Sequence, residues 1–202
     1  MSRIEIRRPE AIDAAWLTRA LQAAGLEAVV ESFEAAPVGT GQIGDSVRFR
    51  LTYSRACEAA PASLVGKFPS ADPVSFGTGV ALGNYAREVK FYRHLAATSL
   101  VSTPRCYAAE VDEATSEFVL LMEDLAPAEQ GDQLAGVTLA QAEQVIDEAA
   151  RLHASHWQDP GLDELAWVSG SRAAPPSQAT PQAVAALWAG FRERYGPRLT
   201  EA

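Results

Sequence analysis

The chain has 202 residues, of which just under half are apolar, and its 17 basic side chains are outnumbered by 26 acidic ones, for a formal net charge of −9. Such a length suits one large or two small domains of a globular protein. The acidic balance argues against nucleic acids and anionic membranes as partners, because both require basic patches. It leaves room for a small phosphate site, since a few N–H groups and one lysine suffice there.

Cysteine usage and the first residues of the chain give the remaining exclusions. Cys57 and Cys106 are not spaced like a disulfide framework or a thiolate metal site, and a packed strand position is expected for Cys106. The N-terminal residues lack the apolar stretch of a signal peptide, and no apolar run is long enough to span a membrane. The sequence therefore predicts a cytoplasmic protein.

The first part of the chain is predicted to be rich in strands. An amphipathic helix is expected over 9–25, with Pro9 in its first turn and Gly25 as its stop. Residues 47–53 alternate between apolar and polar side chains, which predicts a strand with one buried face. The other predicted strands cover residues 29–39, 63–69, 105–111 and 117–122.

One helix is predicted between the third and fourth strands. Residues 70–83 contain three glycines and are expected to form a loop. Asn84 is expected to cap a helix over 85–97, whose apolar stripe includes Tyr85 and Val89. The first part of the chain is thus predicted to be an antiparallel sheet of four or five strands with one inserted helix.

The chain changes character near residue 124 and is helical afterwards. Thr138 and Gln141 form a capping-box pattern for a helix over 139–157. A connection over 158–179 is followed by a last helix over 180–195. His153 and His156 could ligate a metal at this spacing, but we expect two buried or half-buried histidines with hydrogen bonds. The four tryptophans are expected to pack in the core or between helices.

The stretch Gly-Thr-Gly-Gln-Ile-Gly, residues 39–44, has the spacing G-x-G-x-x-G, which occurs in two kinds of nucleotide site and in ligand-free turns. A dinucleotide site requires a helix directly after the third glycine. The alternating pattern over 47–53 predicts a strand there, as in the phosphate-covering hairpin of kinases. Glycines suit such a hairpin because backbone N–H groups must approach phosphate oxygens without an intervening Cβ.

Lys67 and Glu88 add to this interpretation. A kinase-type site places a lysine on the next strand and a glutamate on the next helix that orients the lysine. Lys67 is one of only two lysines in the chain and lies in an apolar strand pattern, where an unpaired charge is costly. Two alternatives stay open: Lys67 could extend to solvent, and Glu88 could pair with Arg87 or Arg93 on its own helix.

With these residues in place, the chain resembles the aminoglycoside-phosphotransferase and choline-kinase branch of the protein-kinase-like fold, in particular the ecdysteroid-kinase-like phosphotransferases. The resemblance runs from about residue 16 to 167 and is most specific in "LLMEDL", "GDQ" and "LHASHW". It implies an α+β fold: a small lobe with a five-stranded antiparallel sheet and one inserted helix, then helices of an incomplete large lobe. The implied parts are an N-terminal helix over 1–28, the small lobe over 29–125 and the start of the large lobe over 126–202.

The resemblance also implies roles for individual residues. Residues 39–44, the glycine turn, would cover the nucleotide phosphates. Lys67 would contact the phosphates, and Glu88 would orient Lys67. Met122 would line the adenine pocket, backbone groups of Glu123 and Leu125 would bind the adenine edge, and the acidic pairs, Asp124 included, are otherwise expected in solvated turns. The nucleotide-binding residues expected in this way are Gly39, Thr40, Gly41, Gln42, Gly44, Lys67, Glu88, Met122, Glu123 and Leu125.

The catalytic loop of these kinases, His-Gly-Asp followed by Asn, does not occur in this sequence. The three histidines are followed by Leu95, Ala154 and Trp157, and Asn84 is the only asparagine. The resemblance therefore implies an ATP- and Mg²⁺-dependent kinase acting on a hydroxyl of a small molecule, with catalytic and metal-binding residues absent from this chain. The alternative is a non-catalytic module that binds a nucleotide or a partner. Exposed apolar surface on an incomplete lobe would favour a homodimer.

Overall fold

The computed structural model describes residues 3–39, 41, 43–132, 134–168 and 181–198. The chain divides into two compact units, Met1–Trp157 and Gln158–Ala202, which are considered separately. Among the described residues, no helix combines the length and apolar character needed to cross a membrane.

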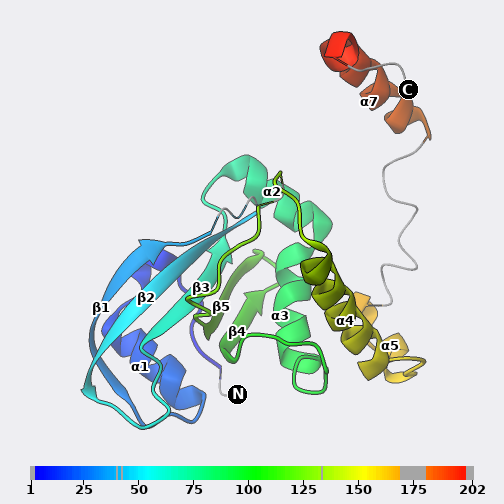
Figure 1. The fold of residues 1–202 in the computed structure, drawn as a ribbon. Helices are drawn as coiled ribbons and strands as arrows, with labels where there is room; N and C mark the ends of the chain where they lie inside the picture. The colour runs from blue at the N-terminus through cyan, green and yellow to red at the C-terminus, as the bar shows by residue number, and fades with distance from the viewer. Residues whose placement is uncertain (1–2, 40, 42, 133, 169–180, 199–202) are drawn as a thin grey trace. The chain divides into compact units, whose positions relative to one another are not determined.

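The first unit is built on one antiparallel sheet in the order β1-β2-β3-β5-β4 (Figure 1). Each predicted strand is present, so the α+β class and the five-stranded sheet are confirmed. The alternating residues 47–53 lie within β2, whereas the apolar run of β5 is buried along most of its length. The strands are β1 (Val29–Pro37), β2 (Gly44–Arg55), β3 (Ser63–Pro69), β4 (Cys106–Asp112) and β5 (Glu117–Glu123).

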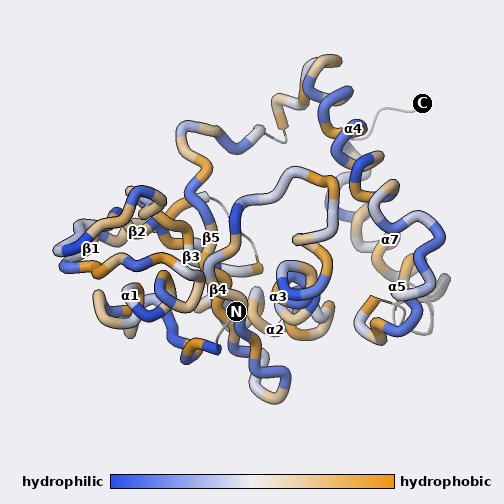
Figure 2. The backbone as a smooth tube through the Cα atoms, turned by 90° about the horizontal axis from the view of Figure 1, so that it is seen from below, coloured by the Kyte–Doolittle hydropathy of each residue, from blue (hydrophilic) through white to orange (hydrophobic). Residues whose placement is uncertain are grey.

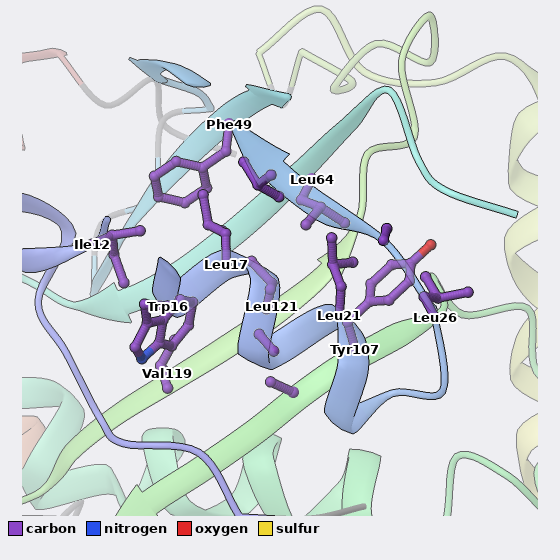
Figure 3. Packing of buried hydrophobic residues seen from close by; sticks show 14 of the residues in the cluster. Ile12, Trp16, Leu17, Leu21, Leu26, Phe49, Leu64, Tyr107, Val119 and Leu121 are labelled. Carbon is purple, nitrogen blue, oxygen red and sulfur yellow. The ribbon is translucent and has the colours of Figure 1, made fainter. Parts of the chain in front are cut away.

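Helix α1 (Ala14–Ala23) packs on one face of the sheet, against β1 and β4. It begins later than predicted: Pro9 opens a separate turn, η1 (Pro9–Ala11), and Asp13 caps α1 by accepting the N–H of Trp16 at 2.6 Å. Gly25, at φ 85°, follows the end of the helix as expected. Figure 3 shows Trp16, Leu17 and Leu21 from α1 among the sheet side chains Phe49, Leu64 and Leu121.

The opposite face of the sheet carries a second apolar cluster. Strand alternation sends Leu64 and Phe68 toward α1, while Phe118, Leu120 and Met122 of β5 point to the other side. There they pack with Tyr85 and Val89 of α3 (Asn84–His94), which contacts β4 and β5. Lys67 directly precedes Phe68 in β3 and pairs with Leu120 of β5. Its side chain therefore extends from the face of the sheet that α3 covers.

Two helices, not one, lie between β3 and β4. Residues predicted as a glycine-rich loop contain α2 (Pro73–Leu82), which Asp72 caps by accepting the N–H of Ser75 at 2.8 Å. Glycines disfavour a helix, but Gly79 is buried against other residues, so packing outweighs propensity here. Asn84 is not a cap: Gly83, at φ 66°, is the N-cap residue of α3 and Asn84 is its first residue.

Helix α4 (Leu139–Ser155) begins at the predicted capping box of Thr138 and Gln141, which is confirmed. It is tied to the segment after α3, since Ser155 Oγ accepts the N–H of Leu100 at 2.6 Å and Glu148 that of Ser102 at 2.7 Å. Hydrophobic residues recur between hydrophilic ones along α4 (Figure 2), and Val145 and Ile146 are exposed.

The second unit contains α5 (Gly161–Glu164), α7 (Pro181–Tyr195) and η2 (Gly196–Arg198). The predicted last helix and its end at Tyr195 are confirmed. The expectation that the tryptophans pack in the core or between helices is wrong for two of them. Trp16 is buried, whereas Trp157, in the turn after α4, and Trp188 of α7 are 73% and 54% exposed.

Gly66 of β3 is predicted to tolerate no side chain. A Cβ there would lie 2.7 Å from the ring of Phe68 and 2.9 Å from that of Phe49. We expect Gly66→Ala to lower the free energy of unfolding by about 2 kcal/mol through overpacking, measured by urea titration. Gly77→Ala is the control, because a Cβ at Gly77 meets nothing within 4 Å. Equal effects of the two substitutions would contradict this packing.

The cap of α4 gives a smaller prediction. Thr138 Oγ1 accepts the N–H of Gln141 at 3.3 Å, and Thr138 N–H donates to Gln141 Oε1 at 2.8 Å. Thr138→Ala is expected to destabilise the first turn of α4 by about 1 kcal/mol, seen as faster amide exchange there. Thr138→Ser keeps a capping hydroxyl and should exchange like the wild type. Exchange unchanged in Thr138→Ala would rule out this role for the hydroxyl.

Candidate functional site

The only lysine in the sheet is held by a glutamate from α3. Lys67 Nζ donates to Glu88 Oε1 at 2.5 Å, and about a third of each side chain is exposed. The two alternative arrangements do not occur: Lys67 does not extend alone into solvent, and the arginines near Glu88 bind elsewhere. Arg87 donates to the Leu82 carbonyl at 3.0 Å, and Arg93 donates to the Ala109 carbonyl and Glu110. The expected pairing of Lys67 with Glu88 is therefore present.

This ion pair lies in a pocket of about 440 Å³, within the size range of small-ligand sites. Three glycines of the G-x-G-x-x-G stretch share the pocket with Lys67 and Glu88, so the turn between β1 and β2, strand β3 and helix α3 converge on it. The full lining is Gly39, Gly41, Ile43, Gly44, Ser46, Lys67, Asn84, Tyr85, Glu88, Phe118 and Gln130.

The glycine turn joins two antiparallel strands, as the kinase-type interpretation requires. Pro37 of β1 pairs with Val47 of β2, and β2 occupies the residues where a dinucleotide site would need a helix. Gly39 has φ 77°, a conformation that favours glycine. A Cβ at Gly44 would lie 2.9 Å from the Phe68 carbonyl oxygen. Thr40 and Gln42 lie outside the described residues.

The three predicted residues at the end of β5 are not in the lining of this pocket. Met122 is almost buried in the cluster on the α3 face, two residues along β5 from Leu120, the register partner of Lys67. Glu123 is fastened to Arg105: its N–H donates to the Arg105 carbonyl at 2.8 Å, and its carboxylate accepts the Arg105 N–H at 3.0 Å. Leu125 is exposed, and its carbonyl accepts the N–H of Ala128.

Asp124 is not in a solvated turn, contrary to the expectation for this acidic pair. Its side chain is 4% exposed and accepts hydrogen bonds from Arg48 at 2.6 Å and from Ser63 at 2.7 Å. Burial acts to raise the pKa of the Asp124 carboxyl, but the hydrogen bonds from Arg48, Ser63 and the Ala126 N–H outweigh burial, so the pKa is lowered. The residue after β5 is thus joined to both β2 and β3.

The remaining candidate residues have local roles. His156 is half-buried with Nε2 3.2 Å from Ser99 Oγ, but His153 is exposed, so the expectation for His153 is wrong because that side of α4 is not covered. Within the described ranges, no three His, Cys, Asp or Glu side chains are placed to hold a metal ion. Cys106 is packed in its strand, and burial raises its pKa to about 11, which disfavours a nucleophilic thiolate.

Several pocket residues were not anticipated as site residues. Ser46 is the register partner of Lys67, so the strand alternation could have placed it on the same face. Asn84 and Tyr85 lie in the pocket at the start of α3, and Gln130 belongs to the segment after β5, for which the sequence carries no clear signal. The Tyr85 hydroxyl donates a hydrogen bond to the Ile43 carbonyl oxygen in the glycine turn at 2.5 Å.

Comparison with models of protein families gives a match. The model of the phosphotransferase enzyme family matches residues 58–201, which is more than half of the chain and includes Lys67 and Glu88 but not the glycine turn. Among curated proteins and solved structures, none matches.

Proposed function

Because the chain belongs to the phosphotransferase enzyme family, we propose that its pocket binds the phosphates of ATP and that it forms the nucleotide-binding part of a small-molecule kinase. The observation that carries the proposal is the Lys67–Glu88 ion pair in one pocket with Gly39, Gly41 and Gly44. In this proposal residues 29–125 act as a kinase-like small lobe and residues 126–202 begin a large lobe.

The residues present fit a polyphosphate. Glycines leave the backbone of the turn open to close approach, and phosphate oxygens need N–H donors and a cation. The Lys67 ammonium would offset phosphate charge, and Glu88 would fix the position of Nζ by accepting its hydrogen bond. ATP would supply the phosphoryl group, while the chain would bind and orient it.

The adenine ring is proposed to lie along the end of β5. The N–H of Glu123 already donates to the Arg105 carbonyl. The carbonyl oxygen of Glu123 would therefore make the contact with adenine. The Leu125 N–H would be the second contact, because the Leu125 carbonyl accepts from Ala128. Met122, on the face of Lys67, would contact the apolar face of the base.

Transfer of the phosphoryl group needs a carboxylate that aligns the acceptor hydroxyl and ligands for Mg²⁺. The sequence contains no His-Gly-Asp, and Asn84 lies in α3 rather than in a catalytic loop. We therefore propose that these 202 residues bind ATP without efficient transfer. The second candidate is a module that binds a nucleotide or a partner and takes no part in catalysis. The absence of His-Gly-Asp favours this candidate as well.

Calorimetric titration of the 202-residue chain tests the proposal. MgATP is expected to bind, and NAD, the ligand of the alternative glycine motif, is expected not to bind. Tighter binding of NAD than of ATP, or no heat with ATP at millimolar concentration, would refute the proposed function. Steady ATP consumption by this chain that Lys67→Ala abolishes would instead refute the absence of transfer.

A further inference from the structure

Tyr85 links helix α3 to the glycine turn. Its hydroxyl donates to the carbonyl oxygen of Ile43 at 2.5 Å, across 42 residues of sequence. The side chain is almost buried, and its ring is stacked on Phe118 with 4.8 Å between centroids. Phe76 of α2 lies on it as well, at 5.9 Å. The ring is therefore fixed by packing, and the hydroxyl is aimed at one backbone atom of the turn.

Helix α2 packs against Tyr85 and Ile43 at a glycine, Gly79. A Cβ at Gly79 would overlap the Tyr85 ring and hydroxyl and would lie 2.8 Å from Cγ2 of Ile43. Gly79 is itself buried. The absence of a side chain at Gly79 thus allows α2, Tyr85 and Ile43 to meet, which accounts for a glycine inside a helix, where it is otherwise unfavourable.

Helix α3, which carries Tyr85, also fixes Lys67. Tyr85 and Glu88 are three residues apart in α3 and so lie on one face of it. Tyr85 binds the turn and Glu88 binds Lys67 of β3, and these three residues line the same pocket with Ile43. One helix therefore sets the position of the turn relative to the ammonium group.

We propose that Tyr85 is a positioning residue that sets the glycine turn over Lys67, so that the backbone N–H groups of the turn and Lys67 Nζ bind the same polyphosphate. The inference rests on the proposed function for its ligand, but the hold on the turn exists without a ligand. Tyr85 acts through Ile43 and does not itself contact the nucleotide. Its contribution is specific to the phosphate end of the ligand.

Tyr85→Phe isolates the hydroxyl, because the ring and its stacking on Phe118 are retained. Tyr92→Phe is the matched control: it removes the same group from the same helix, outside the pocket lining. Gly79→Ala is the second variant and displaces the Tyr85 ring by steric overlap. Amide exchange of Ile43 and Gly44, followed by NMR without nucleotide, is expected to be about five- to tenfold faster in Tyr85→Phe, in line with the loss of one hydrogen bond.

Binding of ATP and adenosine to the full chain then tests the link to the ligand. Tyr85→Phe and Gly79→Ala are expected to weaken ATP binding about fivefold or more and to leave adenosine binding unchanged, whereas Tyr92→Phe changes neither. Equal weakening of ATP and adenosine, or unchanged exchange at Ile43 and Gly44, would overturn the role of Tyr85. Faster exchange in Tyr85→Phe with no ATP binding by the wild type would reject the proposed function, while the hold of Tyr85 on the turn would stand.

Discussion

Lys67→Ala is expected to weaken ATP binding about 100-fold, the largest functional effect that we predict. The substitution removes the cation expected on the phosphates. It also leaves the Glu88 carboxylate, now without its 2.5 Å ion pair, facing phosphate oxygens of the same charge. Calorimetric titration of the purified variant with MgATP measures the effect.

Lys90→Ala is the control for Lys67→Ala because Lys90 is the only other lysine in the chain. Lys90 pairs with Glu113 at 2.9 Å and is not in the pocket lining, so its loss should leave ATP binding unchanged. Adding Glu88→Ala to Lys67→Ala should recover part of the lost affinity, since the repulsive carboxylate is then gone. Comparable losses in the two lysine variants would contradict the assignment of Lys67.

Asp124→Ala is expected to lower the free energy of unfolding by about 3 kcal/mol, because it leaves Arg48 and Ser63 without their shared acceptor. The value lies at the low end for a broken buried ion pair, since a quarter of the Arg48 side chain is exposed and partly hydrated. Urea titration measures the loss. Ser63→Ala, which removes one neutral donor, should have a clearly smaller effect.

The pH dependence gives an independent check on Asp124. Its pKa is lower in the folded protein than in the unfolded chain, so its stabilising contribution is complete above the unfolded pKa of about 4. That contribution is lost as pH falls through the folded value. The difference in stability between wild type and Asp124→Ala should therefore shrink below about pH 4. A difference that stays constant or grows on acidification would contradict a charged, hydrogen-bonded Asp124.

The sequence was sufficient for features that depend on local patterns. Alternation of side chains predicted the strand over 47–53, a short apolar run predicted the strand over 63–69, and Thr138 with Gln141 predicted the start of α4. The Lys67–Glu88 pairing was expected from the order of residues in a kinase-type site, and the cost of an unpaired charge in an apolar strand supported it.

Features that depend on tertiary contacts were missed. The glycines of α2 predict a loop because they disfavour a helix, and the packing of Gly79 on Tyr85 cannot be read from the sequence. Asp124 was placed in a solvated turn because its partner Arg48 is 76 residues away. Tyr85 was expected only as part of an apolar stripe, since nothing local shows that its hydroxyl reaches Ile43.

A crystal structure of the 202-residue chain with Mg²⁺ and a non-hydrolysable ATP analogue tests the central claim most directly. The prediction is that phosphate oxygens lie about 3 Å from Lys67 Nζ and from backbone N–H groups of the glycine turn, with Lys67 still paired to Glu88. A nucleotide bound away from this pocket, or bound with its phosphates remote from Lys67, would contradict it.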